Sequence, residues 1–124
     1  MNTLVYLACP YSHPDPLVRE ARFREANRAS AALMGRGLHI FSPISHTHPI
    51  ALEGNLPGDW HYWRDYDTSV LRACRALVIL QIDGWEASTG IKGEISIAES
   101  LHLPIRRVSP PEYECHLSIV SAEG

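Results

Sequence analysis

Two runs of apolar residues constrain the fold of this chain more than any other feature. Thr3–Ala8 and Ala76–Ile82 are almost continuously apolar and do not alternate with polar residues. Such runs are typical of strands in a parallel sheet whose two faces are both covered by helices. They therefore predict the central strands of a buried parallel sheet.

The first helical pattern follows directly after the first apolar run. The region from Leu17 to Met34 repeats with a period of 3.6 residues, and Asp15 is in position to cap it. The side expected to face the sheet carries Val18, Ala21, Glu25, Ala29 and Leu33.

Further helices and strands alternate along the rest of the chain. A second helix is expected from its cap Asp59 to Cys74, and a third from Ile91 to His102. Two more strands are predicted at Leu38–Ser42 and Pro104–Val108, and Cys115–Val120 is a candidate for a last strand.

This alternation of strands and helices indicates the fold class. We expect one α/β domain over residues 1–124, a doubly wound parallel sheet of four to five strands with helices on both faces, Rossmann-like or flavodoxin-like. Ligands of such folds bind outside the carboxyl ends of the strands. The segment Ile44–Gly58 has no clear period and is expected to be a long loop that sets substrate choice.

Composition argues against several classes of partner. The 124 residues carry a net charge of −3 with only 11 Lys and Arg, so no nucleic-acid partner is expected. No apolar stretch approaches the roughly 20 residues that span a bilayer, and nothing resembles a signal peptide. Three widely spaced cysteines fit free thiols in a reducing compartment. We therefore expect a cytoplasmic protein without a membrane partner or a cofactor.

The turn after the second apolar run is the strongest candidate for chemistry. Asp83–Gly90 is rich in Gly, Ser and Thr and leads into a helix whose first turn is expected to carry Glu94. Backbone N–H groups and the helix dipole favour anions there, so Glu94 is expected to be ionised and suited to act as a nucleophile. An acid at this place can equally serve only to stabilise the dipole, by roughly 0.3–1 kcal/mol.

The residues Ser88, Thr89 and Gly90 of this turn allow two interpretations. Their hydroxyl and N–H groups can form a small phosphate site, or the hydroxyls can simply cap the helix. The turn lacks the glycine pattern of dinucleotide-binding loops and the lysine pattern of triphosphate-binding loops, which disfavours both of those ligands.

Other residues are expected near the same edge of the sheet. Asp67 would bring a second carboxylate toward Glu94, unless it belongs to a solvated helix face. Tyr11 and Trp85 follow predicted strands and are candidates for stacking on a flat base.

Two histidines of the segment Ile44–Gly58 have more than one interpretation. His46 is a candidate contact for the substrate. Together with His48 it also suggests a zinc site, but no carboxylate or Cys completes a familiar ligand spacing. We therefore expect no metal.

Several motifs, taken in their order and spacing, resemble the nucleoside 2-deoxyribosyltransferase-like superfamily. They span roughly residues 3 to 108. The motifs lie at Val5–Tyr11, Phe41–Pro43, Asp67, Ser88–Ala98 and Leu103–Ile105. Within that superfamily the chain is most similar to a small bacterial branch, and it is also similar to the deoxynucleoside monophosphate N-glycosidases.

The resemblance implies three catalytic roles and an oligomer. Glu94 would attack the anomeric carbon of the deoxyribose and form a glycosyl-enzyme intermediate, and Tyr6 would hydrogen-bond and orient this Glu. Asp67 would assist proton transfer near the sugar and the leaving base. The family's shared sites imply a homodimer or homotetramer.

Ser88 favours hydrolysis over base exchange within this resemblance. The transferases often carry an Asp at this position, whereas the N-glycosidases have a Ser that contacts the 5′-phosphate. Cys9–Pro14 lacks the Gly/Arg-rich phosphate loop of those hydrolases. We therefore expect an N-glycosidic-bond hydrolase or transferase that acts on a (deoxy)nucleoside or nucleotide. The alternative is a non-catalytic nucleotide-binding or sensing module of the same fold.

Overall fold

The two apolar runs lie side by side at the centre of a parallel sheet. In this computed structural model, which describes residues 2–110, β1 (Leu4–Ala8) pairs with β3 (Ala76–Leu80). The outer strands are β2 (His39–Phe41) and β4 (Ile105–Val108), and the order across the sheet is β2-β1-β3-β4. All pairs are parallel. The predicted strand at residues 115–120 lies outside the described residues.

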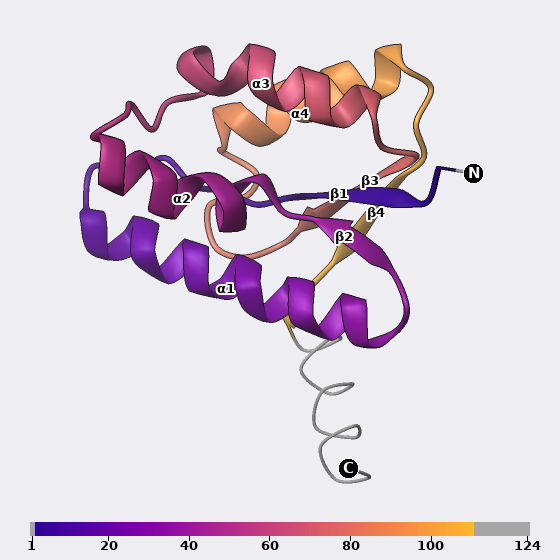
Figure 1. Ribbon diagram of the computed structural model, residues 1–124, viewed down its shortest axis with the longest axis horizontal. Helices are drawn as coiled ribbons and strands as arrows, with labels where there is room; N and C mark the ends of the chain where they lie inside the picture. The colour runs from indigo at the N-terminus through magenta and orange to yellow at the C-terminus, as the bar shows by residue number, and fades with distance from the viewer. Residues whose placement is uncertain (1, 111–124) are drawn as a thin grey trace, which may run out of the picture.

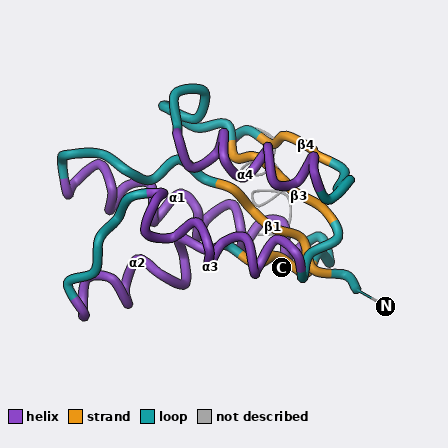
Figure 2. Tube along the Cα trace, turned by 90° about the horizontal axis from the view of Figure 1, so that it is seen from above, coloured by secondary structure: helices purple, strands orange, loops and turns teal. Residues whose placement is uncertain are grey.

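Within residues 2–110, four helices cover the sheet in two layers, and the ribbon shows one layer on each face (Figure 1). The helices α1 (Pro16–Gly35) and α2 (Pro43–Gly54) lie on one face, and α3 (Trp60–Arg72) and α4 (Thr89–Ser100) lie on the other. The view from above shows the same helices packed along the strands (Figure 2). The predicted α/β class, with helices on both faces of a parallel sheet, is confirmed.

The strand β1 supplies both hydrophobic cores because its side chains alternate between the two faces. Val5 and Leu7 pack with the buried residues of α1, whereas Tyr6 and Ala8 pack with residues of α3 and α4. This alternation sends Tyr6 into the layer of α3 and α4, where it is fully buried.

The predicted start of α1 is confirmed, but its predicted inner side is wrong in part. Asp15 caps the helix by accepting a hydrogen bond from the N–H of Leu17 at 2.9 Å. Ala21 is exposed and Glu25 is only half-buried. The buried residues of this helix are Ala26, Ala29, Ser30, Ala32 and Leu33. Small residues therefore allow the helix to approach the sheet closely.

The prediction of a long loop at Ile44–Gly58 is wrong, because most of this segment is α2. Ser42 caps the helix by accepting a hydrogen bond from the N–H of Ser45 at 3.3 Å, and Pro43 occupies its first turn. The helix includes Pro49 and ends before Asn55, which adopts the left-handed conformation. Pro49 obscured the helical signal, since an interior proline normally interrupts a helix.

None of the helices within residues 2–110 combines the length and the apolar character needed to cross a membrane.

Candidate active site

A cavity opens at the carboxyl ends of β1 and β3, where ligands bind in doubly wound folds. Its volume is about 460 Å³, within the range of roughly 300–1,000 Å³ that is usual for small-molecule sites. Both helical layers contribute to its wall. The lining residues that matter below include Tyr11, Arg22, His48, Trp60, Ser88 and Glu94.

Two carboxyl groups and one tyrosine form a buried cluster at this cavity. Glu94 comes from α4 and Asp67 from α3, and both line the cavity. Tyr6 donates a hydrogen bond from its hydroxyl to Oε2 of Glu94, and the same hydroxyl interacts with Asp67. Within the described residues, Oδ1 of Asp67 is buried without a hydrogen-bond partner. The tertiary structure thus brings together the three residues for which catalytic roles were expected.

Burial raises the pKa of both carboxyl groups. Loss of hydration raises the pKa of Glu94 to about 8, although the hydrogen bond from Tyr6 opposes the shift, and the nearby charge of Asp67 adds to it. Loss of hydration also raises the pKa of Asp67 to about 7, again opposed by Tyr6. Two carboxylates that share one hydroxyl cannot both ionise easily, so the pair retains protons near neutral pH.

The expectation that the helix dipole holds Glu94 ionised is therefore wrong. The helix α4 begins at Thr89 and not at Ile91, and it has no acidic residue in its first turn. Glu94 lies in the second turn, where the influence of the dipole has fallen off. Desolvation then dominates, and it favours the protonated carboxyl group.

The turn before α4 serves as a helix cap and also lines the cavity. Ser88 accepts a hydrogen bond from the N–H of Ile91 at 3.1 Å through its side-chain oxygen, so the capping interpretation is confirmed. Ser88, Thr89 and Gly90 all line the cavity. Within residues 2–110, the N–H groups of Thr89 and Gly90 have no protein acceptor, as is usual for the start of a helix. The phosphate interpretation stays a prediction.

The predicted stacking and contact residues divide between the cavity and the rest of the protein. Tyr11 lines the cavity. Trp85 instead packs against the hydrophobic core of α3 and α4, with the guanidinium of Arg107 over its ring at 5.7 Å. His46 is exposed and lies beside the ring of Phe41 at 5.9 Å. Neither Trp85 nor His46 is among the residues that line the cavity.

Comparison with known families gives one match. The model of a domain of unknown function, DUF1937, matches residues 3–109, which is almost the whole described chain. The chain belongs to this family. No curated protein matches it.

The cavity of this DUF1937 domain includes residues that were not among the predicted site residues. Trp60 and Trp63 line it from α3, and Trp60 packs so closely on α4 that a Cβ at Gly93 would overlap its indole ring. Arg22 lines it from α1 and donates to the carbonyl oxygen of Ser12 at 3.1 Å. Both tryptophans follow the predicted cap Asp59 in the sequence, but whether their side chains reach the cavity depends on how α3 packs.

His48, which the sequence suggested only as a possible zinc ligand, is the most buried of these additional residues. It is only 4% exposed, and both of its ring nitrogens lie within hydrogen-bond distance of protein side chains. Within residues 2–110, no group of three or more His, Cys, Asp or Glu side chains is arranged to hold a metal ion. If residues 43–54 had been predicted to form a helix, His48 and Ala51 would both have been placed on its buried side.

The thiol of Cys9 also belongs to the surroundings of this site. Cys9 lines the cavity, but burial strongly raises the pKa of its thiol, so it is not an activated nucleophile.

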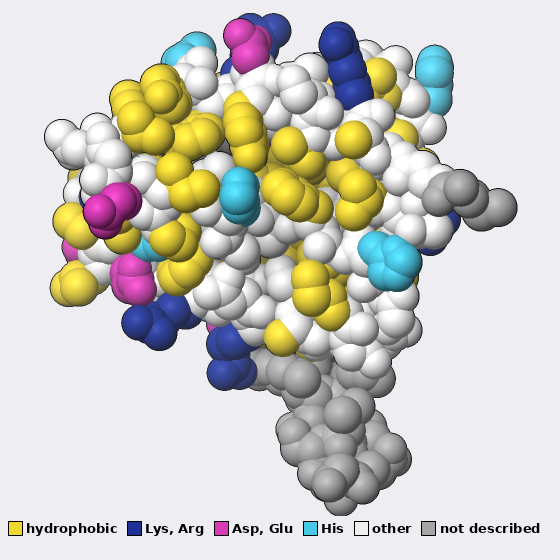
Figure 3. Space-filling model, in the orientation of Figure 1, with side chains coloured by type: hydrophobic (Ala, Val, Ile, Leu, Met, Phe, Trp, Pro, Cys, Tyr) yellow, Lys and Arg dark blue, Asp and Glu magenta, His cyan; other side chains and the backbone are white. Residues whose placement is uncertain are grey.

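The face of the DUF1937 domain seen in Figure 3 is covered mainly by apolar and uncharged groups, and its basic side chains lie separately near the edges. The described part of this face therefore presents no continuous basic patch for a nucleic acid.

Proposed function

We propose that this domain cleaves the N-glycosidic bond of a (deoxy)nucleoside or nucleotide, with Glu94 as the nucleophile. The observation that supports this most strongly is the cluster in the cavity wall, where the hydroxyl of Tyr6 holds the carboxyl group of Glu94 beside Asp67. A positioned carboxylate can attack the anomeric carbon of a nucleoside and form a covalent glycosyl-enzyme intermediate, which water then hydrolyses.

Glu94 is reactive in the protonation state of the pair in which Asp67 holds the proton and Glu94 is ionised. In that arrangement Tyr6 donates to an ionised Glu94, and the protonated Asp67 adds no second charge to the buried site. Attack on the sugar converts the carboxylate into a neutral ester, which relieves the cost of its desolvation. A raised pKa is therefore compatible with a nucleophile whose charge is lost during the reaction.

The rest of the cavity wall suits a nucleoside or nucleotide. Trp60 and Trp63 offer ring faces for a planar base. The N–H groups at the start of α4, with the hydroxyl of Ser88, offer donors for an anionic group such as a 5′-phosphate. Arg22 adds a positive charge that, within residues 2–110, has no carboxylate partner. These features favour a nucleotide over a nucleoside as the substrate, and Ser88, through the resemblance, favours hydrolysis over base exchange.

The proposal is tested by looking for free base. Purified protein is incubated with a panel of nucleosides, 2′-deoxynucleoside monophosphates and NAD, and the products are separated by chromatography. We expect the wild type to release base from at least one compound and Glu94→Ala to release none. Glu99→Ala, an exposed change on the same helix, is the matched control and should retain activity. Unchanged base release by a folded Glu94→Ala protein would refute the role of Glu94.

One observation favours a second candidate function, a non-catalytic nucleotide-binding or sensing module. The pKa of Glu94, raised to about 8 by burial, leaves this group largely protonated at neutral pH, and a neutral carboxyl group can simply donate a hydrogen bond to a ligand. This module would bind a nucleotide of the panel without turnover, and the binding would tolerate Glu94→Gln. Calorimetric titration with the same panel separates the two functions.

A further inference from the structure

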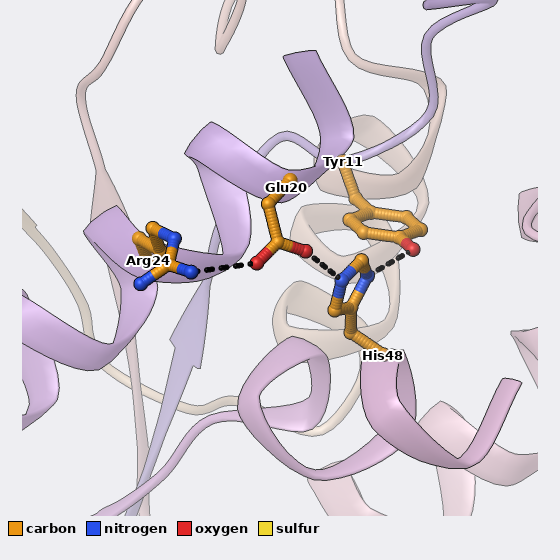
Figure 4. Close-up of polar contacts among 4 residues, drawn as sticks. All are labelled: Tyr11, Glu20, Arg24 and His48. Atoms are coloured by element: carbon orange, nitrogen blue, oxygen red, sulfur yellow. Dashed lines mark hydrogen bonds and ion pairs between the residues drawn. The ribbon is translucent and has the colours of Figure 1, made fainter. Parts of the chain in front are cut away.

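A row of three hydrogen-bonded side chains runs from the cavity to the protein surface. Tyr11, in the loop after β1, lies with its hydroxyl 2.6 Å from Nδ1 of His48 in α2. Nε2 of His48 lies 2.7 Å from Oε2 of Glu20 in α1. Glu20 also pairs with Arg24 at 3.3 Å; Arg24 is exposed and Glu20 is half-exposed. Figure 4 shows the four side chains in this order, from Tyr11 through His48 and Glu20 to Arg24.

The imidazole in the middle of this row is held rigidly. His48 is 4% exposed, and its ring stacks on Phe23 with a centroid distance of 4.3 Å and an interplanar angle of 27°. Tyr11 meets the same imidazole edge-on at 5.5 Å. With both nitrogens bonded and both ring contacts in place, His48 has one orientation, which also aligns the Tyr11 hydroxyl.

The chemistry of the end groups determines where the protons lie. An ionised Glu20 can only accept, so Nε2 of His48 carries a proton and donates it to Oε2. In the neutral imidazole, Nδ1 then accepts from the hydroxyl of Tyr11. In the imidazolium, Nδ1 donates to the Tyr11 oxygen, and the phenolic proton is free to point into the cavity. Burial raises the pKa of Tyr11, although the charge of Arg19 opposes this, so the phenol retains its proton.

The row lies in the opposite helical layer from the two carboxyl groups. Glu94 and Asp67 reach the cavity from α4 and α3, whereas Glu20 and His48 belong to α1 and α2 on the other face of the sheet (Figure 1). In a displacement at a glycosidic carbon, the nucleophile and the proton donor to the leaving group flank the bond that breaks. Asp67 shares the hydroxyl of Tyr6 with the nucleophile, so a donor from the other layer fits this requirement better.

We propose that Tyr11 is a catalytic residue that donates the proton to the departing base, and that His48 and Glu20 position and resupply it. This inference rests on the proposed function. As the bond from C1′ to the base nitrogen breaks, its electron pair stays on the base, and the phenolic proton of Tyr11 moves to the base. The step starts from the imidazolium form of His48: its Nδ1 proton moves to the Tyr11 oxygen, which leaves the imidazole neutral with Nε2–H on Glu20.

A second step, with a water molecule, closes the cycle. In the first step, C1′ forms a bond to a carboxylate oxygen of Glu94 as its bond to the base breaks. Water then attacks C1′, the ester bond breaks, and Glu94 regains its charge. The proton that this water releases passes through Tyr11 to Nδ1 of His48. One water is consumed for each base and sugar released, and all groups return to their starting protonation.

The test compares leaving groups that do and do not need a proton. For a purine substrate, the pair is deoxyguanosine, or its 5′-monophosphate, and the 7-methyl derivative, whose cationic base departs as a neutral molecule. For a pyrimidine substrate, the pair is the deoxyuridine compound and its 5-nitro derivative, whose base is a good leaving group. We expect Tyr11→Phe to lower the single-turnover rate of base release from the ordinary substrate by about 10²–10⁴-fold and to leave that of the activated substrate nearly unaffected, because base release precedes the step in which Tyr11 takes up the proton of water.

Two further variants separate catalysis from folding. Glu20→Gln keeps a hydrogen-bond acceptor at a half-exposed position and should show a smaller loss with the same preference for the activated substrate. Tyr62→Phe, at an exposed tyrosine outside the cavity lining, and Glu53→Gln on the outside of α2 are the matched controls. Equal losses on both members of the pair, or no loss at all, would overturn the role of Tyr11. No base release by the wild type would instead reject the proposed function.

Discussion

The buried carboxyl group of Glu94 should make the stability of this protein depend on pH in a direction that follows from its raised pKa. In the unfolded chain Glu94 releases its proton near pH 4.5, whereas burial in the folded state delays the release to about pH 8. Between these values the folded state binds a proton that the unfolded state has lost. The free energy of unfolding therefore falls as pH rises through this range.

The magnitude follows from the same two values. Each unit of pKa corresponds to about 1.4 kcal/mol, so the rise from 4.5 to about 8 costs at most roughly 5 kcal/mol once the pH exceeds 8. A domain of this size is stable by about 5–15 kcal/mol in total, so the loss is a large part of its stability. In Glu94→Gln, an amide of the same shape accepts the Tyr6 hydrogen bond and has no proton to lose.

Urea denaturation of the wild type and Glu94→Gln at several pH values between 5 and 9 measures this effect. We expect the two proteins to differ least at pH 5 and the glutamine variant to be more stable by several kcal/mol at pH 9. Glu99→Gln, an exposed change on the same helix, should follow the wild type at every pH. Parallel stability curves for the wild type and Glu94→Gln would refute the argument, because they would mean that Glu94 ionises equally in both states.

Two further predictions concern the hydrogen bonds around this cluster. Tyr6→Phe removes the hydrogen bond that lowers the pKa of Glu94. The rising limb of the pH profile of base release should therefore move to higher pH, by about 1–2 pH units. A rising limb at unchanged pH would show that Tyr6 does not lower the pKa of Glu94. Ser88→Ala removes the cap of α4 and should lower the free energy of unfolding by about 0.5–2 kcal/mol in urea denaturation. If Ser88 also binds a 5′-phosphate, this variant should raise KM for nucleotides and leave KM for nucleosides unchanged; an equal effect on both would restrict Ser88 to capping.

The difference between the predicted and observed state of Glu94 has a local origin. The sequence places this residue after a Gly, Ser and Thr-rich turn, which suggests a carboxylate at the start of a helix. One hydrogen bond, from the N–H of Ile91 to Ser88, starts the helix earlier and moves Glu94 into its second turn. The proximity of Asp67 and the exclusion of water then reverse the expected direction of the pKa shift, and neither depends on the residues next to Glu94.

The segment from Pro43 to Gly54 shows a second limit of local reasoning. Its start signal, Ser42 followed by Pro43, is present in the sequence, but Pro49 and the lack of a wide apolar side argue against a helix. Packing against α1 compensates for both, because it buries His48 between Phe23 and Glu20. The row from Tyr11 to Glu20 therefore could not be read from the sequence, where its members belong to three separate segments.

Continuous apolar runs and helical periods are local patterns, and only a sheet covered on both faces can bury them, so the chain alone specifies the parallel α/β fold. The chain also suggested Glu94 and Asp67 as candidate site residues, whereas the role of Tyr6 was expected only from the resemblance. What these groups can do depends on the folded structure, since protonation, hydrogen bonding and exposure depend on neighbours that are distant in sequence. The same holds for His48, which becomes part of the candidate site only where α1 and α2 meet.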